Sequence, residues 1–315
     1  MAQMSELEKF LREQISEGDK ESSGKFTLSR EKALEKLAAF QFPRPTAWVL
    51  KVLQAVYLSG AGELTIRQTQ TDTQFFFRPQ FPWKLNEVES EFYNPESSPQ
   101  PDIDHLKRAL WGPGLNDMRP FRLSLPEAPE ALVWDGRELR RQPSEPQDYA
   151  NLTMSHRSFL SGRGLFILRD IEAARCNADV LEELRNFAYV YPIPLQLDQR
   201  RLDGLYACPT QGSGNENFPI HLLFAQAPTP SMSFPRGALE ATSESVAGPV
   251  DANAACLLAA HFRRVERDKK MVWETPSRSS NLRWVVDGVI VDTDDLPVPA
   301  SPISCSIFAS AEGLA

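Results

Sequence analysis

The most apolar stretch of the chain predicts a buried helix, a tight turn and a strand. From Ala47 to Leu58 only Lys51 and Gln54 interrupt the apolar residues. This run is shorter than the roughly 20 residues that span a membrane, and a helix that is apolar on all sides is typical of a protein core. The glycines of Ser59 to Gly62 favour a helix end. The alternating pattern of Glu63 to Gln68 then indicates a half-buried strand.

The rest of the chain alternates short helical patterns with short strand patterns, and two Asp-Gly pairs indicate hairpins. Helices are predicted over Ser5 to Ile15, Arg30 to Phe40, Leu85 to Phe92, Asp104 to Leu110 and Ile171 to Phe187. Strands or hairpins are predicted at Thr71 to Arg78, Phe121 to Leu125, Ala131 to Trp134, Asp135-Gly136, Asn151 to Phe159, Leu195 to Asp198, Pro219 to Phe224, Leu282 to Val291 and Ile303 to Phe308, and Ala254 to Val265 fits either a strand or a helix.

Changes in composition mark the predicted domain boundaries. Gly18 to Lys25 is polar and contains glycine, which is typical of a flexible connector. Arg140 to Asp148 is charged, contains proline and has no apolar residue, as expected of an interdomain linker. Ala315 follows soon after the last predicted strand, which leaves open that the native chain continues. We therefore predict an N-terminal helix and linker over 1–25, a first domain over 26–140 and a second domain over 149–315.

Charge and cysteine usage narrow the function classes. With 42 acidic and 34 basic residues, the net charge of −8 argues against general binding to a nucleic-acid backbone. The four cysteines form no Cys-x-x-Cys pair, which argues against a zinc knuckle or a disulfide framework and fits a reducing compartment. The N-terminus is charged where a signal peptide needs an apolar core. We therefore expect a cytoplasmic protein that binds neither nucleic acid nor membranes.

Two stretches resemble conserved boxes of the GHKL ATPases, the group that contains gyrase, MutL, histidine kinases and the large heat-shock chaperones. The helix that ends in Ser59-Gly60-Ala61 before a strand resembles their first box. The turn Gly112-Pro113-Gly114-Leu115, followed by the strand pattern of Phe121 to Leu125, resembles their third box, which closes over phosphate. The resemblance implies an α+β fold whose first domain is a Bergerat-type α/β sandwich, with a mixed sheet and helices on one face.

The second half of the chain resembles the transducer domain that follows the ATPase fold in MutL and the heat-shock chaperones. The residues concerned form a β-α-β pattern that runs from Asn151 through the Ile171 helix to Leu195-Gln196-Leu197-Asp198. The resemblance therefore implies a second, transducer-like α+β domain.

The residues that carry chemistry in this family are absent here. In the family the first-box helix carries a glutamate, an asparagine four residues on and often an aspartate three further on, where this chain has Lys51, Ala55 and Leu58. A protonated lysine cannot act as the base that activates water, and alanine offers no oxygen to Mg²⁺. Arg78 to Trp83 lacks the aspartate and glycines that hold adenine. We therefore expect no catalytic residue and no metal site, and the positions that would line a retained nucleotide pocket are Lys51, Ala55, Leu58, Gly112 and Gly114.

Other candidate residues have simpler interpretations. Lys51 could pair with a phosphate, but a lysine that extends from a buried helix to solvent explains it more simply. The remaining candidates favour core or solvated positions over a ligand site: the histidines His105, His156, His221 and His261, the turn Gly162-Arg163-Gly164, the acidic run Asp292, Asp294 and Asp295, and the basic run Arg263 to Lys270.

The favoured function is a non-catalytic, pseudo-ATPase scaffold of chaperone-like type that binds a protein partner, with a homodimer left open. The alternative is an ATP-binding switch that uses magnesium, Lys51 and the Gly112 to Gly114 turn, and a third option is an unrelated α/β module. If the pocket is lost, Ala55 and Leu58 should contact apolar neighbours. Of the changes that restore the family residues, Leu58→Asp is then expected to cost the most stability.

Overall fold

The computed structural model describes residues 42, 44–156, 166–202, 220–228, 246–247, 254–267, 270–274, 280–297 and 303–310. Several predicted features lie outside these residues, so the structure does not bear on them. They are the helices over Ser5 to Ile15 and Arg30 to Phe40, the connector Gly18 to Lys25, and the turn Gly162-Arg163-Gly164.

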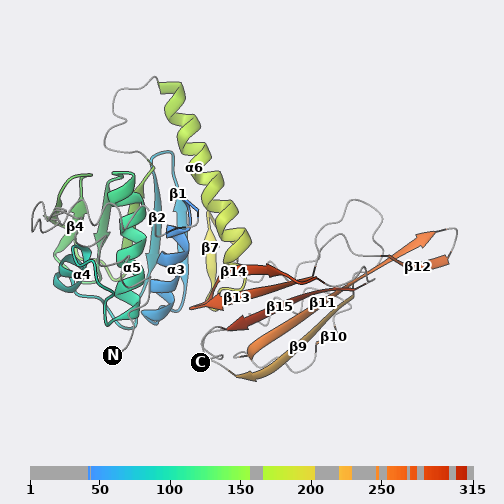
Figure 1. Cartoon of the computed structure of the whole chain (residues 1–315). Helices are drawn as coiled ribbons and strands as arrows, with labels where there is room; N and C mark the ends of the chain where they lie inside the picture. Colours follow the sequence, from blue (N-terminus) through green and yellow to red (C-terminus); the bar gives the residue numbers. More distant parts are fainter. Residues whose placement is uncertain are drawn as a thin grey trace, which may run out of the picture.

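The described residues up to Arg201 form an eight-stranded mixed sheet with helices on one face (Figure 1). All neighbouring strands are antiparallel except the parallel pair of β1 and β7. The strand order is β5 (Leu139–Pro143), β4 (Glu130–Trp134), β3 (Phe121–Ser124), β6 (Ala150–Ser155), β2 (Asp72–Phe77), β1 (Leu64–Gln68), β7 (Leu195–Leu197) and β8 (Arg200–Arg201). The helices are α3 (Trp48–Leu58), α4 (Leu85–Phe92), α5 (Pro101–Trp111), the π-helix η1 (Gly112–Asn116) and α6 (Phe166–Phe187). The predicted α+β class, with a mixed sheet and helices on one face, is confirmed.

Alternation along the strands gives this sheet one apolar face and one polar face. The strand registers place Ile66, Phe75, Leu152 and Leu123 side by side across four neighbouring strands. Each of these side chains is at most 1% exposed. Burial of one such side chain stabilises a fold by about 1.5–3 kcal/mol, so this row alone fixes which face the helices cover.

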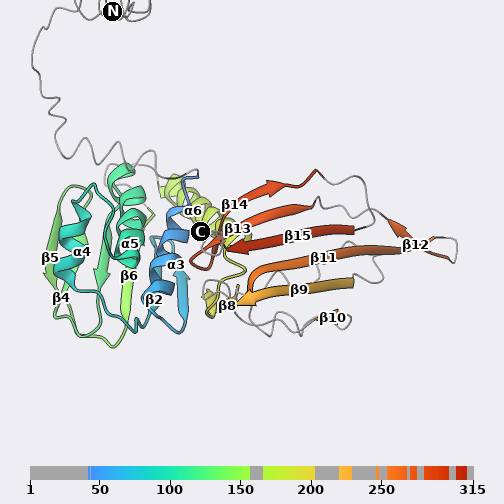
Figure 2. The same ribbon diagram turned by 60° about the horizontal axis from the view of Figure 1, so that its bottom comes forward.

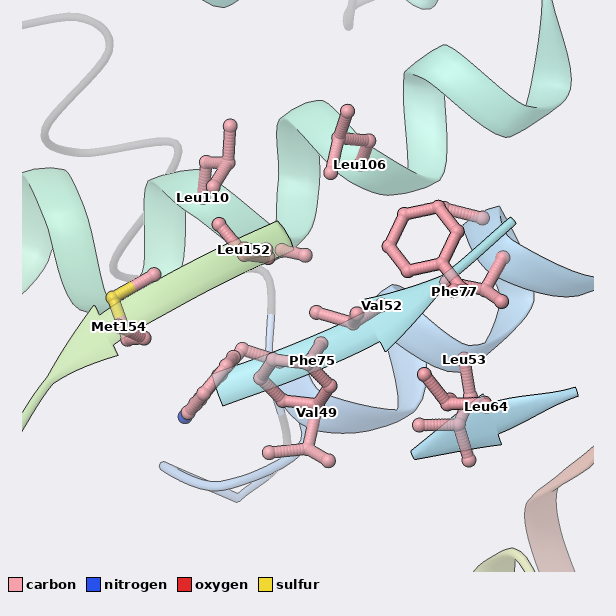
Figure 3. Close-up of a cluster of buried hydrophobic side chains, with 14 of the residues drawn as sticks. Val49, Val52, Leu53, Leu64, Phe75, Phe77, Leu106, Leu110, Leu152 and Met154 are labelled. Atoms are coloured by element: carbon pink, nitrogen blue, oxygen red, sulfur yellow. The ribbon is translucent and has the colours of Figure 1, made fainter. Parts of the chain in front are cut away.

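Helix α3 packs directly onto this apolar face, as Figure 3 shows for Val49, Val52 and Leu53 beside Phe75 and Phe77. Helix α5 lies next to α3 and contributes further buried side chains to the same core. The predicted buried helix is therefore confirmed. Among the residues that the structure describes, no helix is long and apolar enough to cross a membrane.

The end of α3 follows the predicted glycine signal. Gly60 has a φ of 74°, and its backbone N–H donates to the carbonyl of Tyr57 at 3.0 Å. The next N–H, of Ala61, donates to the carbonyl of Val56 at 3.4 Å. These two hydrogen bonds define a Schellman motif, which turns the chain directly into strand β1.

The described strands from Ile220 onward form a separate sheet that extends away from the first sheet and its helices (Figure 2). The sequence of Ala254 to Val265 fits either a strand or a helix, and in the structure these residues form a strand. The order is β10 (Val246–Ala247), β9 (Ile220–Pro228), β11 (Ala254–Arg267), β15 (Ile303–Ser310), β13 (Asn281–Val286) and β14 (Val289–Asp295), and β12 (Lys270–Glu274) pairs with β11.

The segment predicted as a domain boundary, Arg140 to Asp148, does not separate the two sheets. Strand β5 at its start and strand β6 after it belong to the same sheet, where β6 lies between β3 and β2. Among the strands that the structure describes, the chain changes sheet only between β8 and β9. Arg140 to Pro143 lacks apolar residues because these four residues are the exposed part of an edge strand, and an edge strand can be as polar as a linker.

The hairpin between β13 and β14 brings the second sheet onto the helical layer. Its tip has φ angles of 47° at Asp287 and 82° at Gly288, as expected of the predicted Asp-Gly hairpin. A Cβ atom on Gly288 would lie 2.4 Å from Cδ of Pro192 and 3.3 Å from the ring of Tyr191. The tip is therefore packed against this segment with no room for a side chain.

We predict that Gly288→Ala destabilises the protein by about 1–3 kcal/mol, because the new methyl group clashes with Pro192 and the backbone conformation is strained. Urea unfolding measures the loss. Gly62→Ala is the matched control, since a Cβ atom there has no neighbour within 4 Å. An equal loss in both variants would contradict the tight contact at the tip.

Candidate functional site

Three polar side chains meet where the helices contact the β13–β14 hairpin. Lys51 comes from α3, His105 from α5 and Asp287 from the hairpin tip. Lys51 Nζ lies 3.4 Å from His105 Nδ1, and His105 Nε2 lies 2.9 Å from a carboxylate oxygen of Asp287. This Lys51–His105–Asp287 array links both helices to the second sheet.

The hydrogen bonds of the array are consistent with one tautomer of its histidine. When Nε2–H of His105 donates to Asp287, Nδ1 is left as an acceptor for the ammonium group of Lys51. The array then runs from a cation through a neutral ring to an anion. Burial lowers the pKa of Lys51, as does the positive charge of Arg108, while Asp287 and Asp104 act in the opposite direction.

A second charged group on α5 is neutralised within the helical layer. Asp104 accepts one hydrogen bond from the backbone N–H of Ser98 at 2.9 Å, and its carboxylate lies 2.7 Å from Arg108 and 3.2 Å from Lys107. Burial opposes ionisation of Asp104, but these interactions outweigh it, so the pKa of Asp104 lies below its ordinary value. The two basic residues beside the array are therefore already paired.

Further contacts fix α3 against the second sheet and the segment after α6. The side-chain amide of Gln54 donates to the carbonyl of Val286 at 3.0 Å. The hydroxyl of Tyr191 donates to the carbonyl of Leu53 at 2.6 Å, and burial raises the pKa of Tyr191 well above its ordinary value. This side of α3 is therefore occupied by the protein itself.

The three helical positions identified from the sequence have different surroundings. Lys51 is partly buried and contacts His105. Ala55 is 0% exposed and belongs to the hydrophobic core. Leu58 is only partly buried and lies outside that core cluster. The apolar surroundings expected for both residues are thus present for Ala55, whereas Leu58 is partly accessible to solvent.

The glycines of the predicted phosphate turn are packed against aromatic rings. They lie in the π-helix η1, which the sequence did not predict. A Cβ atom on Gly112 would lie 2.6 Å from the ring of Phe42, and one on Gly114 would lie 3.2 Å from the ring of Phe121. The carbonyl of Gly114 accepts a hydrogen bond from the indole of Trp134 at 3.0 Å. Close packing by rings therefore accounts for both glycines.

The other candidates from the sequence give no ligand site in the described part of the chain. His156 is buried, and its Nε2 lies 2.9 Å from the hydroxyl of Thr73. Asp292, Asp294 and Asp295 are exposed on β14, and Asp294 accepts a hydrogen bond from Trp284. Among the described residues, no group of three acidic, histidine or cysteine side chains could hold a metal ion. The side chains of His221, His261 and the basic run Arg263 to Lys270 lie outside the described residues.

The sequence did not single out His105 or Asp287 as members of one array. They are 182 positions apart, and only the docking of the hairpin brings them together. The sole local signal was the Asp-Gly pair, which predicts a hairpin but not its contact.

Comparison with known proteins finds similarity at the level of structure. No protein-family profile and no curated protein matches the sequence. The chain is similar to the N-terminal domain of a DNA repair protein, with 7% identity, 89% of this chain and 88% of that chain covered, and a TM-score of 0.43. It is similar to the MutL ATPase domain of Aquifex aeolicus complexed with ADP (8% identity, 85% and 92% covered, TM-score 0.40). It is also similar to the B-subunit of the DNA gyrase from Myxococcus xanthus (11% identity, 84% and 78% covered, TM-score 0.41). Similarity at this level assigns no activity.

We predict that Lys51→Met changes how stability depends on pH. Since the pKa of Lys51 is lowered in the folded state, the unfolded chain binds more protons between this pKa and the ordinary value for lysine. The free energy of unfolding of the parent protein should therefore rise relative to Lys51→Met across that window. Urea unfolding from about pH 7 to about pH 10 measures the difference. Lys84→Met, at a side chain that is 76% exposed, should show no such trend, and a parallel trend in both variants would contradict the prediction.

Proposed function

We propose that this chain is a non-catalytic scaffold derived from an ATPase fold and that it binds a protein partner. The observation that carries the proposal is the Lys51–His105–Asp287 array. At the position where the ATPases that this chain resembles are expected to hold their general base, this chain has a cation that contacts His105, and His105 in turn contacts Asp287 of the second sheet. A contact of this kind serves to hold the two sheets together and does not activate water.

The chemistry of the neighbouring positions supports a scaffold. Hydrolysis of ATP needs an ionised base and oxygen ligands for magnesium. Lys51 is no such base, and the wholly buried Ala55 offers neither an oxygen nor access for an ion. The rings that pack on Gly112 and Gly114 lie against the turn that would close over phosphate. These features point away from a nucleotide as the ligand.

The alternative is a switch that binds ATP through Lys51 and the turn from Gly112 to Gly114. A partly buried ammonium group could pair with a phosphate as a point charge. This alternative requires Lys51 to leave His105 and the rings of Phe42 and Phe121 to move. The scaffold requires no such change, and we therefore favour it.

The partner and the compartment belong to the same proposal. A protein partner, with a second copy of this chain as one option, suits a fold that retains its shape without the residues for catalysis. The reducing cytoplasm is the proposed compartment, supported by four cysteines without a Cys-x-x-Cys pair.

We predict that the protein gives no saturable, magnesium-dependent heat signal with ATP in calorimetry at high-micromolar concentration. The reason is the missing magnesium ligand at Ala55 and the missing adenine aspartate between Arg78 and Trp83. The same titration in EDTA is the control. A saturable signal that EDTA abolishes would support the ATP-binding alternative.

We predict that the triple variant Lys51→Glu, Ala55→Asn and Leu58→Asp is destabilised and gains no hydrolysis. An uncompensated buried polar group costs several kcal/mol against a total stability of about 5–15 kcal/mol. Ala55→Asn should dominate because Ala55 is 0% exposed, which reverses the order expected from the sequence. Thermal melts of the single and triple variants measure this order. A triple variant as stable as the parent would mean that the face is open to water, and a gain of ATP hydrolysis would overturn the scaffold.

A further inference from the structure

The face of the first sheet that points away from the helices carries a row of polar side chains. Alternation places these residues opposite the buried row, and the registers set them next to one another across six neighbouring strands, with one valine among them. From β5 to β1 the row consists of Arg140, Val133, Arg122, Thr153, Gln74 and Arg67. We call this row the open-face row.

Two arginines of the open-face row have no carboxylate partner among the described residues. The guanidinium of Arg67 lies over the ring of Phe76, 5.1 Å from its centre. Arg122 donates to the backbone carbonyl of Pro143 at 3.4 Å, a long hydrogen bond. Both side chains are at least partly exposed, so each can form the two parallel hydrogen bonds that a carboxylate accepts from a guanidinium.

The other charges near this row are already engaged. Arg140 forms an ion pair with Glu138. Asp72, a carboxylate on the same face, accepts hydrogen bonds from Thr71 and Gln74. Arg67 and Arg122 are therefore the arginines of the row that have no acidic partner among the described residues.

Within the described part of the chain, Arg67 and Arg122 lack a carboxylate partner although the chain is acidic. The sequence has 42 acidic residues and 34 basic residues, so carboxylates are in excess. On the helical face Arg44 pairs with Glu183 and Arg108 pairs with Asp104. Arg141, adjacent to Arg140 on the same edge strand, reaches the helical side and pairs with Glu89. These three arginines on the helical side have acidic partners, whereas Arg67 and Arg122 on the open face have none among the described residues.

The spacing of the arginines fits an extended ligand. Neighbouring strands lie about 4.8 Å apart, so Arg140 and Arg122, two strands apart, are separated by about 10 Å, and Arg122 and Arg67, three strands apart, by about 14 Å. The whole row spans about 24 Å, the length of an extended segment of about seven residues. Gln74 and Thr153 lie between the two unpaired arginines and offer hydrogen bonds to a backbone.

We infer that the open-face row binds an acidic, extended segment of a protein partner, with Arg67 and Arg122 as the carboxylate-binding residues. This inference rests on the proposed scaffold function and names the surface and the chemistry of its partner. A guanidinium also binds phosphate, but a single-stranded nucleic acid needs free aromatic rings on which its bases stack. Phe76 is covered by Arg67 on one side and contacts Tyr149 edge-on at 5.8 Å.

The test uses the full chain and a fluorescein-labelled peptide of ten glutamates, followed by fluorescence anisotropy at low salt. The parent protein should bind the peptide, and binding should weaken as salt is raised. The double variant Arg67→Gln, Arg122→Gln should bind at least tenfold more weakly. The matched control is Arg175→Gln, Arg185→Gln, which removes the same charge from exposed positions on α6, and its affinity should stay within twofold of the parent. Thermal melts establish that both variants are folded.

Three results would overturn the inference. The first is no binding of the peptide by the parent protein, and the second is an equal loss in both double variants, which would indicate only general charge attraction. The third is tighter binding of an oligo-dT strand that depends on the same two arginines, which would assign the face to nucleic acid. Calorimetry with magnesium and ATP tests the scaffold separately, because that site lies on the opposite side of the sheet. Failure of the peptide to bind would thus leave the scaffold standing, and ATP hydrolysis would overturn the scaffold alone.

Discussion

The structure depends on the need to cover one helix that is apolar on almost every side. Helix α3 has eight buried residues out of eleven, so no single neighbour can shield it from water. The sheet covers one side, α5 and α6 lie along others, and the β13–β14 hairpin closes a further part. The position of the second sheet follows from this requirement, because its hairpin tip is one of the surfaces that complete the core.

Local signals in the sequence were sufficient for the elements around α3. The apolar run, the glycine turn and the Asp-Gly hairpins were predicted because each depends on neighbouring residues alone. The segment Arg140 to Asp148 was interpreted as a linker, but it connects two strands of one sheet. An exposed edge strand and an interdomain linker both avoid apolar residues, and only strand pairing distinguishes them.

The candidate site was less predictable, because its contacts join distant parts of the chain. Lys51 was identified from its place in the helix, but its partner His105 belongs to α5, and Asp287 belongs to the second sheet. Gly112 and Gly114 show a second limit of prediction from the sequence. Glycine permits close approach of either an anion or an aromatic ring, and the sequence does not say which of the two is present.

The edges of the first sheet bear on whether a further strand can pair with it. An open strand edge is a template for pairing with another chain. Here one edge is β8, which is only two residues long, and the other is β5, whose last residue is Pro143. Proline donates no backbone hydrogen bond, and the arginines of β5 place charge along that edge. Both ends of the sheet thus resist the addition of a further strand, so copies of this chain are poorly suited to aggregate through it.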